Sequence, residues 1–78
     1  MNKVRVFSTR TCPYCNMLKE YLRQHNIPFE DIMVDSDYNA AMEMIRISGQ
    51  RGVPVAEING NVVVGFDQAR INSLLGIA

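Results

Sequence analysis

The residues best suited to chemistry in this chain are two cysteines, Cys12 and Cys15, which enclose Pro13 and Tyr14. Three residues span about one helical turn, so the two sulfurs lie close enough to form a disulfide with each other. An attacking thiolate and a second, resolving thiol together carry out thiol–disulfide exchange through a mixed disulfide. The spacing therefore predicts a redox-active pair. Two alternatives are a pair of inert buried thiols and half of a metal site shared between two chains.

The position of the pair, between a predicted strand and a predicted helix, favours the redox interpretation. Pro13 suits a first helical position, because the N–H that proline lacks would be unpaired there. Free backbone N–H groups and the helix dipole then face the first sulfur and favour its negative charge. Such a site lowers a thiol pKa from about 8.5 toward neutrality. Cys12 is therefore the sulfur expected to form the nucleophilic thiolate.

The elements that must position this pair are predicted by alternating and helical apolar patterns. They form one α/β domain, residues 1–78, in the order βα-βα-ββα, with strands expected at residues 3–8, 29–34, 53–58 and 62–64. A helix joins the first two strands, which should therefore be parallel, whereas Asn59-Gly60 predicts a tight hairpin between the last two. A mixed four-stranded sheet flanked by three helices buries all of these apolar faces.

Each expected helix has a start signal and an apolar side. The first begins at Pro13, and its inward stripe is expected to comprise Tyr14, Met17, Leu18, Tyr21 and Leu22. The second follows a cap within residues 35–37 and stops near Gly49. Asp67 caps the third helix, whose core-facing residues are expected to be Ile71, Leu74 and Leu75.

Composition narrows the classes of function. The chain has 78 residues, is 47% hydrophobic and carries no net charge, so it lacks the strongly basic signature of a nucleic-acid binder. No apolar run approaches the ~20 residues that cross a membrane, and the first residues lack the apolar core of a signal peptide. We therefore expect a cytoplasmic monomer with no nucleic-acid or membrane partner. Thiols stay reduced in that compartment, where a close cysteine pair is catalytic or metal-binding rather than structural.

A second candidate feature is Gly52-Val53-Pro54, ahead of the third strand. Proline is tolerated at the start of a strand without any function. Alternatively, a cis Val53–Pro54 bond would hold the Val53 backbone open for pairing with a thiol-bearing peptide. Tyr14 is likewise either a plain helix-start residue or an exposed aromatic that contacts such a partner.

Together these features resemble the glutaredoxins over essentially the whole chain. The resemblance is carried by Cys-Pro-Tyr-Cys after the first strand, Val-Pro before the third, and Gly-x-Asp at the last helix. It implies a thioredoxin fold, a cis proline at Pro54 facing the cysteines, and exchange with Cys12 as nucleophile and Cys15 as resolving thiol. It also implies that a glutathione groove is lined by Tyr14, Val53, Pro54, Gly65, Phe66 and Asp67.

In such a groove the resemblance gives each part of glutathione its own contact. The Val53 backbone pairs with the cysteinyl part, Asp67 receives the α-amino and α-carboxylate end, and a cation takes the glycyl carboxylate. Arg10 and Arg51 are the expected cations, on loops near Cys12, where positive potential also favours a thiolate. The alternative is that both arginines are simply solvated. Glutathione is then a co-substrate, with no bound cofactor and no metal.

Departures from the glutaredoxin pattern bear on the electron donor. Thr9, beside Arg10, stands where glutaredoxins commonly have lysine, and Gly52 stands where they have threonine. Their Gly-Gly-x-Asp-Asp appears as Val-Gly-Phe-Asp-Gln over residues 64–68. Gly65-Phe66 is also similar to the glutaredoxin-like redoxins that take electrons from thioredoxin reductase and serve ribonucleotide reductase, although those usually lack Pro-Tyr between the cysteines. Two donors therefore stay open: glutathione and a thioredoxin-reductase-type flavoprotein.

Three classes of function follow from these residues. The first is a dithiol oxidoreductase that reduces disulfide-bearing proteins or glutathione mixed disulfides. The second is a module in which Cys12 of two chains and external thiols hold an iron–sulfur cluster. Cys15 and Pro13 count against it, because a resolving thiol competes for Cys12 and a rigid proline crowds the cluster. The third is a structural adaptor, which an unreactive Cys12 would favour.

Overall fold

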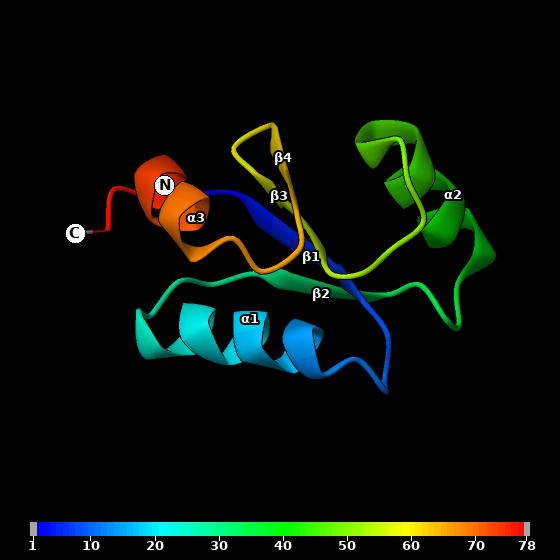
Figure 1. Ribbon diagram of the computed structural model, residues 1–78, viewed down its shortest axis with the longest axis horizontal. Helices are drawn as coiled ribbons and strands as arrows, with labels where there is room; N and C mark the ends of the chain where they lie inside the picture. The colour runs from blue at the N-terminus through cyan, green and yellow to red at the C-terminus, as the bar shows by residue number, and fades with distance from the viewer. Residues whose placement is uncertain (1, 78) are drawn as a thin grey trace.

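Strands and helices follow one another in the predicted order βα-βα-ββα (Figure 1). The computed structural model describes residues 2–77. Its strands are β1 (Val4–Ser8), β2 (Glu30–Met33), β3 (Val55–Ile58) and β4 (Asn61–Val64). Its helices are α1 (Pro13–Gln24), α2 (Tyr38–Ser48) and α3 (Gln68–Leu75). None of the helices in this part of the chain is long and apolar enough to cross a membrane.

The strands form one mixed sheet in the order β2-β1-β3-β4. The pair β1–β2 is parallel, whereas β1–β3 and β3–β4 are antiparallel. Phe7, near the end of β1, pairs with Val55 at the start of β3, and Val55 pairs with Val64 at the end of β4. The loops after β1, before β3 and after β4 therefore all leave the sheet at the same edge. These loops and the first turn of α1 carry the predicted site residues.

Helices cover both faces of the sheet, as predicted. On one face α1 and α3 share a core whose buried members are Val4, Val6, Leu18, Leu22, Ala56, Ile58, Val63 and Ile71. Leu74 and Leu75 of α3 pack against this cluster as expected. On the other face α2 packs through Met44 onto Phe7 and Val55. In Figure 1, α2 lies on the right of the view, apart from α1 and α3 on the left.

The predicted start and stop signals act as local chemistry requires. Asp37 and Asp67 are the N-caps of α2 and α3, where each carboxylate accepts a backbone N–H at 3.1 Å. Gly49 ends α2 with φ +74°, a left-handed conformation that glycine adopts without steric cost. Asn59 and Gly60 also have positive φ, as a two-residue hairpin between β3 and β4 requires.

The predicted inward stripe of α1 is partly wrong. Tyr14 and Met17 are exposed, at 62% and 49% of their surface. The buried side of the helix instead consists of Cys15, Leu18, Lys19 and Leu22, which follow the spacing i, i+3, i+4, i+7. The stripe predicted from apolar residues alone lies one residue too early in the sequence. Cys15 and Lys19 belong to the buried side of the helix, and hydrophobic patterning does not predict a buried lysine.

Candidate active site

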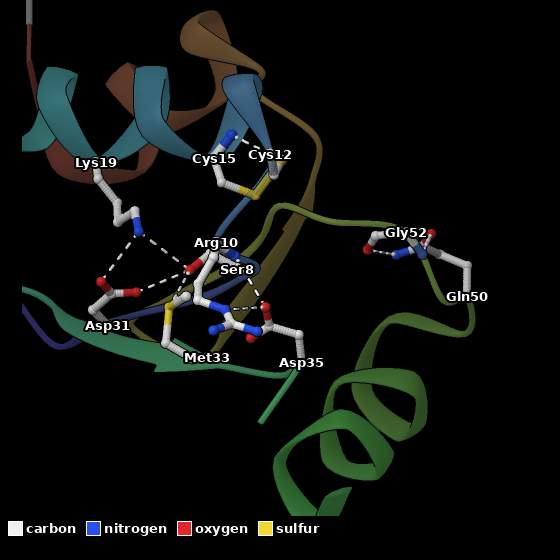
Figure 2. The surroundings of a disulfide bond; sticks show 10 residues. All are labelled: Ser8, Arg10, Cys12, Cys15, Lys19, Asp31, Met33, Asp35, Gln50 and Gly52. Atoms are coloured by element: carbon white, nitrogen blue, oxygen red, sulfur yellow. Dashed lines mark hydrogen bonds and ion pairs between the residues drawn. A yellow bond between two sulfur atoms is a disulfide. The ribbon is translucent and has the colours of Figure 1, made fainter. Parts of the chain in front are cut away.

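Cys12 and Cys15 form a disulfide at the N-terminus of α1 (Figure 2). Cys12 is the N-cap residue, with extended backbone angles, and Pro13 occupies the first helical position as predicted. The Cα atoms of the two cysteines are 5.2 Å apart. The Cys12 sulfur accepts the backbone N–H of Cys15 at 3.1 Å. The first sulfur therefore does what a capping side chain usually does, and a thiolate at this position keeps that donor.

The two sulfurs differ in access. Cys12 is half-buried, whereas Cys15 is completely buried at 0% exposure. An incoming thiolate attacks the sulfur that it can reach, and the other sulfur of the bond leaves. This difference in access favours attack at Cys12 over attack at Cys15, in line with the division of roles implied by the family resemblance, and those roles stay a prediction.

We expect the pKa of the Cys12 thiol in the reduced protein to lie clearly below that of Cys15. Only Cys12 caps the helix and faces its free N–H groups, whereas Cys15 is completely buried. The rate of alkylation of each cysteine against pH, followed by peptide mass, measures both values. A Cys12 thiol that titrates near the unperturbed value of about 8.5 would show that the helix start has no effect on it.

The other predicted groove residues meet at this edge of the sheet. The Val53–Pro54 peptide bond is cis, as the resemblance implies. β3 begins only at Val55, two residues later than predicted, so Val53 and Pro54 belong to the preceding loop. The Gly65 N–H donates to the Pro54 carbonyl at 2.8 Å, which ties the loop before β3 to the loop after β4.

Phe66 and Asp67 continue from Gly65 into α3. Phe66 packs edge-on against Tyr21 of α1, with ring centroids 5.7 Å apart. Together with Met17 these aromatic residues line a shallow groove of about 430 Å³ between α1 and the start of α3. Asp67 is exposed, although one carboxylate oxygen caps α3. Tyr14, exposed beside the disulfide, is free to contact a partner as predicted, and that contact stays a prediction.

Of the two predicted cations, Arg10 is tied to a carboxylate that the sequence did not indicate. Its backbone N–H and its Nε atom both donate to Asp35 Oδ2 at 3.2 Å, from the loop that follows β2 (Figure 2). These bonds, the backbone one first, hold the pKa of Asp35 below its ordinary value. The Arg10 side chain is nevertheless 78% exposed, and Arg51 is exposed as well.

A glutamine that sequence patterns did not mark holds the loop before Val53. Gln50 uses both ends of its amide on one residue: its oxygen accepts the Gly52 N–H at 2.6 Å, and its nitrogen donates to the Gly52 carbonyl at 3.0 Å. A Cβ atom at Gly52 would lie 2.8 Å from that Gln50 oxygen. Glycine, rather than the threonine common in the family, therefore leaves room at position 52 for the two hydrogen bonds with the Gln50 amide.

A polar cluster under α1 was also missed. Lys19, only 7% exposed, donates to Ser8 Oγ at 3.3 Å and pairs with Asp31 Oδ2 at 3.1 Å. The Ser8 hydroxyl, itself buried, is 2.9 Å from Asp31 Oδ1 and 3.3 Å from Met33 Sδ. The one feature of the sequence that indicates this cluster is the spacing of Lys19 from Cys15. Residues four apart lie on the same side of a helix.

Fold and site together define the class of protein: a small α/β chain with a dithiol pair at a helix start and a cis proline at the same sheet edge. Comparison with known proteins gives the family, because residues 4–63 match the Glutaredoxin family. A relative of Clostridium pasteurianum, an uncharacterised glutaredoxin-like 8.6 kDa protein in the rubredoxin operon, is 46% identical over 72 residues. The match covers 92% of this chain and 96% of that protein. The chain belongs to the glutaredoxin family.

Solved structures agree with this assignment and with the thioredoxin fold. A glutaredoxin from Archaeoglobus fulgidus has a TM-score of 0.86 at 26% identity, covering 96% of this chain and 87% of its own. The glutaredoxin-like NrdH-redoxin from Escherichia coli has a TM-score of 0.81 at 28% identity, covering 92% and 93%. The chain is therefore a glutaredoxin-like redox protein whose Cys12–Cys15 pair occupies the predicted place in the fold.

Proposed function

We propose that this chain is a dithiol thiol–disulfide oxidoreductase that reduces disulfide-bearing proteins and glutathione mixed disulfides. The observation that carries the proposal is the asymmetry of the disulfide, with a reachable Cys12 sulfur at the helix start and a fully buried Cys15 beside it. Membership of the glutaredoxin family supports the same chemistry. We further propose that the protein acts as a cytoplasmic monomer, since a reducing compartment keeps the pair available as thiols.

The proposed cycle conserves atoms and electrons at each step. The Cys12 thiolate attacks a substrate disulfide, so that a Cys12–substrate bond forms and the second substrate sulfur leaves as a thiolate. Cys15 then attacks the Cys12 sulfur, the Cys12–substrate bond breaks, and the Cys12–Cys15 disulfide closes. The substrate has gained two electrons, and two thiol equivalents from a donor return the protein to its reduced form.

Glutathione is the donor that we propose first, acting as a co-substrate rather than a bound cofactor. Val53, Gly65 and Asp67 lie on loops that leave the sheet at the edge where α1 begins, which is the arrangement that a groove along the disulfide needs. The Asp67 carboxylate is exposed for the α-amino group, and Arg10 or Arg51 offers a cation for a carboxylate.

A thioredoxin-reductase-type flavoprotein is the second candidate donor, and the Arg10–Asp35 pair favours it. A guanidinium held by Asp35 is less available to a glutathione carboxylate. The structural similarity to NrdH-redoxin, a glutaredoxin-like protein with a thioredoxin-like activity profile, supports the same alternative. This donor would dock on the protein surface and would not depend on the groove.

One comparison separates the two donors. Reduction of a disulfide substrate is followed through NADPH consumption, in one assay with glutathione and glutathione reductase and in the other with thioredoxin reductase. Faster turnover with glutathione supports the first candidate, and faster turnover with the flavoprotein supports the second. Failure of both systems, with the dithiol pair intact, would contradict the proposed oxidoreductase.

We expect Asp35→Asn to raise glutathione-driven turnover by about two- to fivefold, the effect of releasing one exposed ion pair. The substitution removes the carboxylate charge that holds the Arg10 guanidinium near the site. The pair is present at neutral pH, because the lowered pKa of Asp35 keeps its carboxylate charged there, and the pair is lost only as pH falls through that value. An unchanged KM for glutathione in Asp35→Asn would mean that Arg10 does not bind glutathione in the groove.

A further inference from the structure

The proposed cycle requires a negative charge on the sulfur of Cys15, which is a buried residue and therefore a costly place for a charge. Cys15 must become a thiolate twice, as the nucleophile that resolves the mixed disulfide and as the leaving group when the disulfide is reduced. Its side chain is completely buried on the inward side of α1. Burial in apolar surroundings disfavours a thiolate, so this step needs a compensating positive charge.

Such a charge is present one turn along the same helix. Cys15 and Lys19 are four residues apart, both buried, and neighbours on the inward side of α1, where Cβ atoms at this spacing lie about 5–6 Å apart. Figure 2 shows both side chains projecting from α1 toward the sheet, with the Lys19 ammonium reaching Ser8 and Asp31. A buried lysine is rare unless its charge is paired, as it is here with Asp31, and packing of the core does not itself require a charge.

The other charged groups around this pocket leave Lys19 as the cation placed to act on Cys15. In residues 2–77, β1 contributes the neutral hydroxyl of Ser8 and β2 contributes Asp31, whose side chain is 38% exposed. Arg10 and Asp35 pair with each other at the surface. The remaining charged residues of α1, Glu20 and Arg23, are also paired with each other and exposed. The buried residues that β3 and α3 contribute to the core shared with α1 are apolar: Ala56, Ile58 and Ile71.

We propose that Lys19, held by Asp31 and Ser8, is a positioning residue that stabilises the thiolate of Cys15 and thereby speeds the second step of the exchange. The inference rests on the proposed function and assigns a role within it. Lys19 acts through space and does not contact the substrate, while Asp31 keeps the ammonium buried and Ser8 orients it. Attack by Cys12 occurs at the helix start and does not depend on Lys19.

Stopped-flow reaction of the reduced protein with 5,5′-dithiobis(2-nitrobenzoate) separates the two steps. Cys12 attacks the reagent disulfide and releases one thionitrobenzoate, leaving the other on Cys12. Cys15, whose proton passes to solvent, then attacks the Cys12 sulfur and releases the second thionitrobenzoate as its bond to Cys12 breaks. In Lys19→Met we expect the first phase unchanged and the second at least about tenfold slower at neutral pH. Its rise with pH should move to higher pH, a shift that a purely structural role would not produce.

Two further variants keep the test decisive. Lys19→Met combined with Asp31→Asn leaves no unpaired charge and should show the same slow second phase even where the single variant folds poorly. Arg5→Met is the matched control. It breaks the half-buried ion pairs of Arg5 with Glu57, at 2.6 Å, and with Glu43, at 3.1 Å, on the opposite face of the sheet. Both phases should stay at the parent rates.

A second phase with the parent rate and pH profile in both Lys19 variants would overturn the proposal, as would equal slowing in Arg5→Met. The Cys15→Ser protein, which releases only the first thionitrobenzoate, reports Cys12 alone, and Lys19→Met should not alter its rate. Loss of the first phase in the parent protein would instead contradict the proposed function, so the two failures are distinguishable.

Discussion

Replacing Cys12 with serine is expected to abolish reduction of protein disulfides. The substitution leaves the helix cap in place, since a serine hydroxyl also accepts an N–H at that position, but it removes the nucleophile that starts the cycle. Cys15 cannot take over, because its side chain is completely buried. NADPH-coupled turnover of a protein disulfide, with unfolding followed in parallel, measures the loss in a protein that is still folded.

Cys15→Ser should behave differently. Attack by Cys12 is intact, so a mixed disulfide accumulates, and glutathionylated substrates can still be turned over when a second glutathione takes the place of the resolving thiol. Protein disulfides should not be released at an appreciable rate. If Cys15→Ser formed no mixed disulfide while Cys12→Ser still formed one, the two roles would be reversed and the argument from the helix start would be wrong.

The second large effect is expected at Asp67, which has two separable roles. Its carboxylate is proposed to receive the α-amino end of glutathione, and the same side chain caps α3 through the Arg70 N–H at 3.1 Å. Asp67→Asn keeps a capping oxygen and removes the charge. Loss of one charge-assisted hydrogen bond costs about 1.5–3 kcal/mol, so glutathione-driven turnover should fall by roughly ten- to a hundredfold.

Two comparisons make the Asp67 result specific. Asp67→Ala removes the cap as well, so it should also lower the free energy of unfolding by about 1 kcal/mol, whereas Asp67→Asn should not. Turnover driven by thioredoxin reductase should change little in Asp67→Asn, since that donor docks on the surface. Unchanged glutathione-driven turnover in Asp67→Asn would mean that the groove is not used, and the flavoprotein would become the better candidate donor.

Local signals made much of the fold predictable. Pro13 and the two capping aspartates act within a few residues of themselves, and Asn59-Gly60 closes the hairpin that it predicted. The site was predictable for a related reason. The N–H groups and the dipole that act on the first sulfur belong to the helix that begins next to it in the sequence. The chemistry of the pair therefore depends on few distant residues.

The contacts that escaped prediction are those that join residues distant in the sequence. Asp35 meets Arg10 because β1 and β2 are parallel and end at the same edge, which periodicity within either segment does not show. Lys19 was hidden because patterning treats lysine as a surface residue, and only the sheet beneath α1 supplies Asp31 as its partner. Patterning also put Met17 in the apolar stripe of the helix, although the structure leaves it 49% exposed.

The central claim is that the Cys12 sulfur, at the start of α1, forms the covalent intermediate. The most direct test incubates reduced Cys15→Ser with glutathione disulfide, then digests the protein and locates the added glutathione by peptide mass. We predict one glutathione on Cys12, formed faster than on a free thiol of ordinary pKa at the same pH. A protein that stays unmodified, or that reacts no faster than such a thiol, would contradict the account.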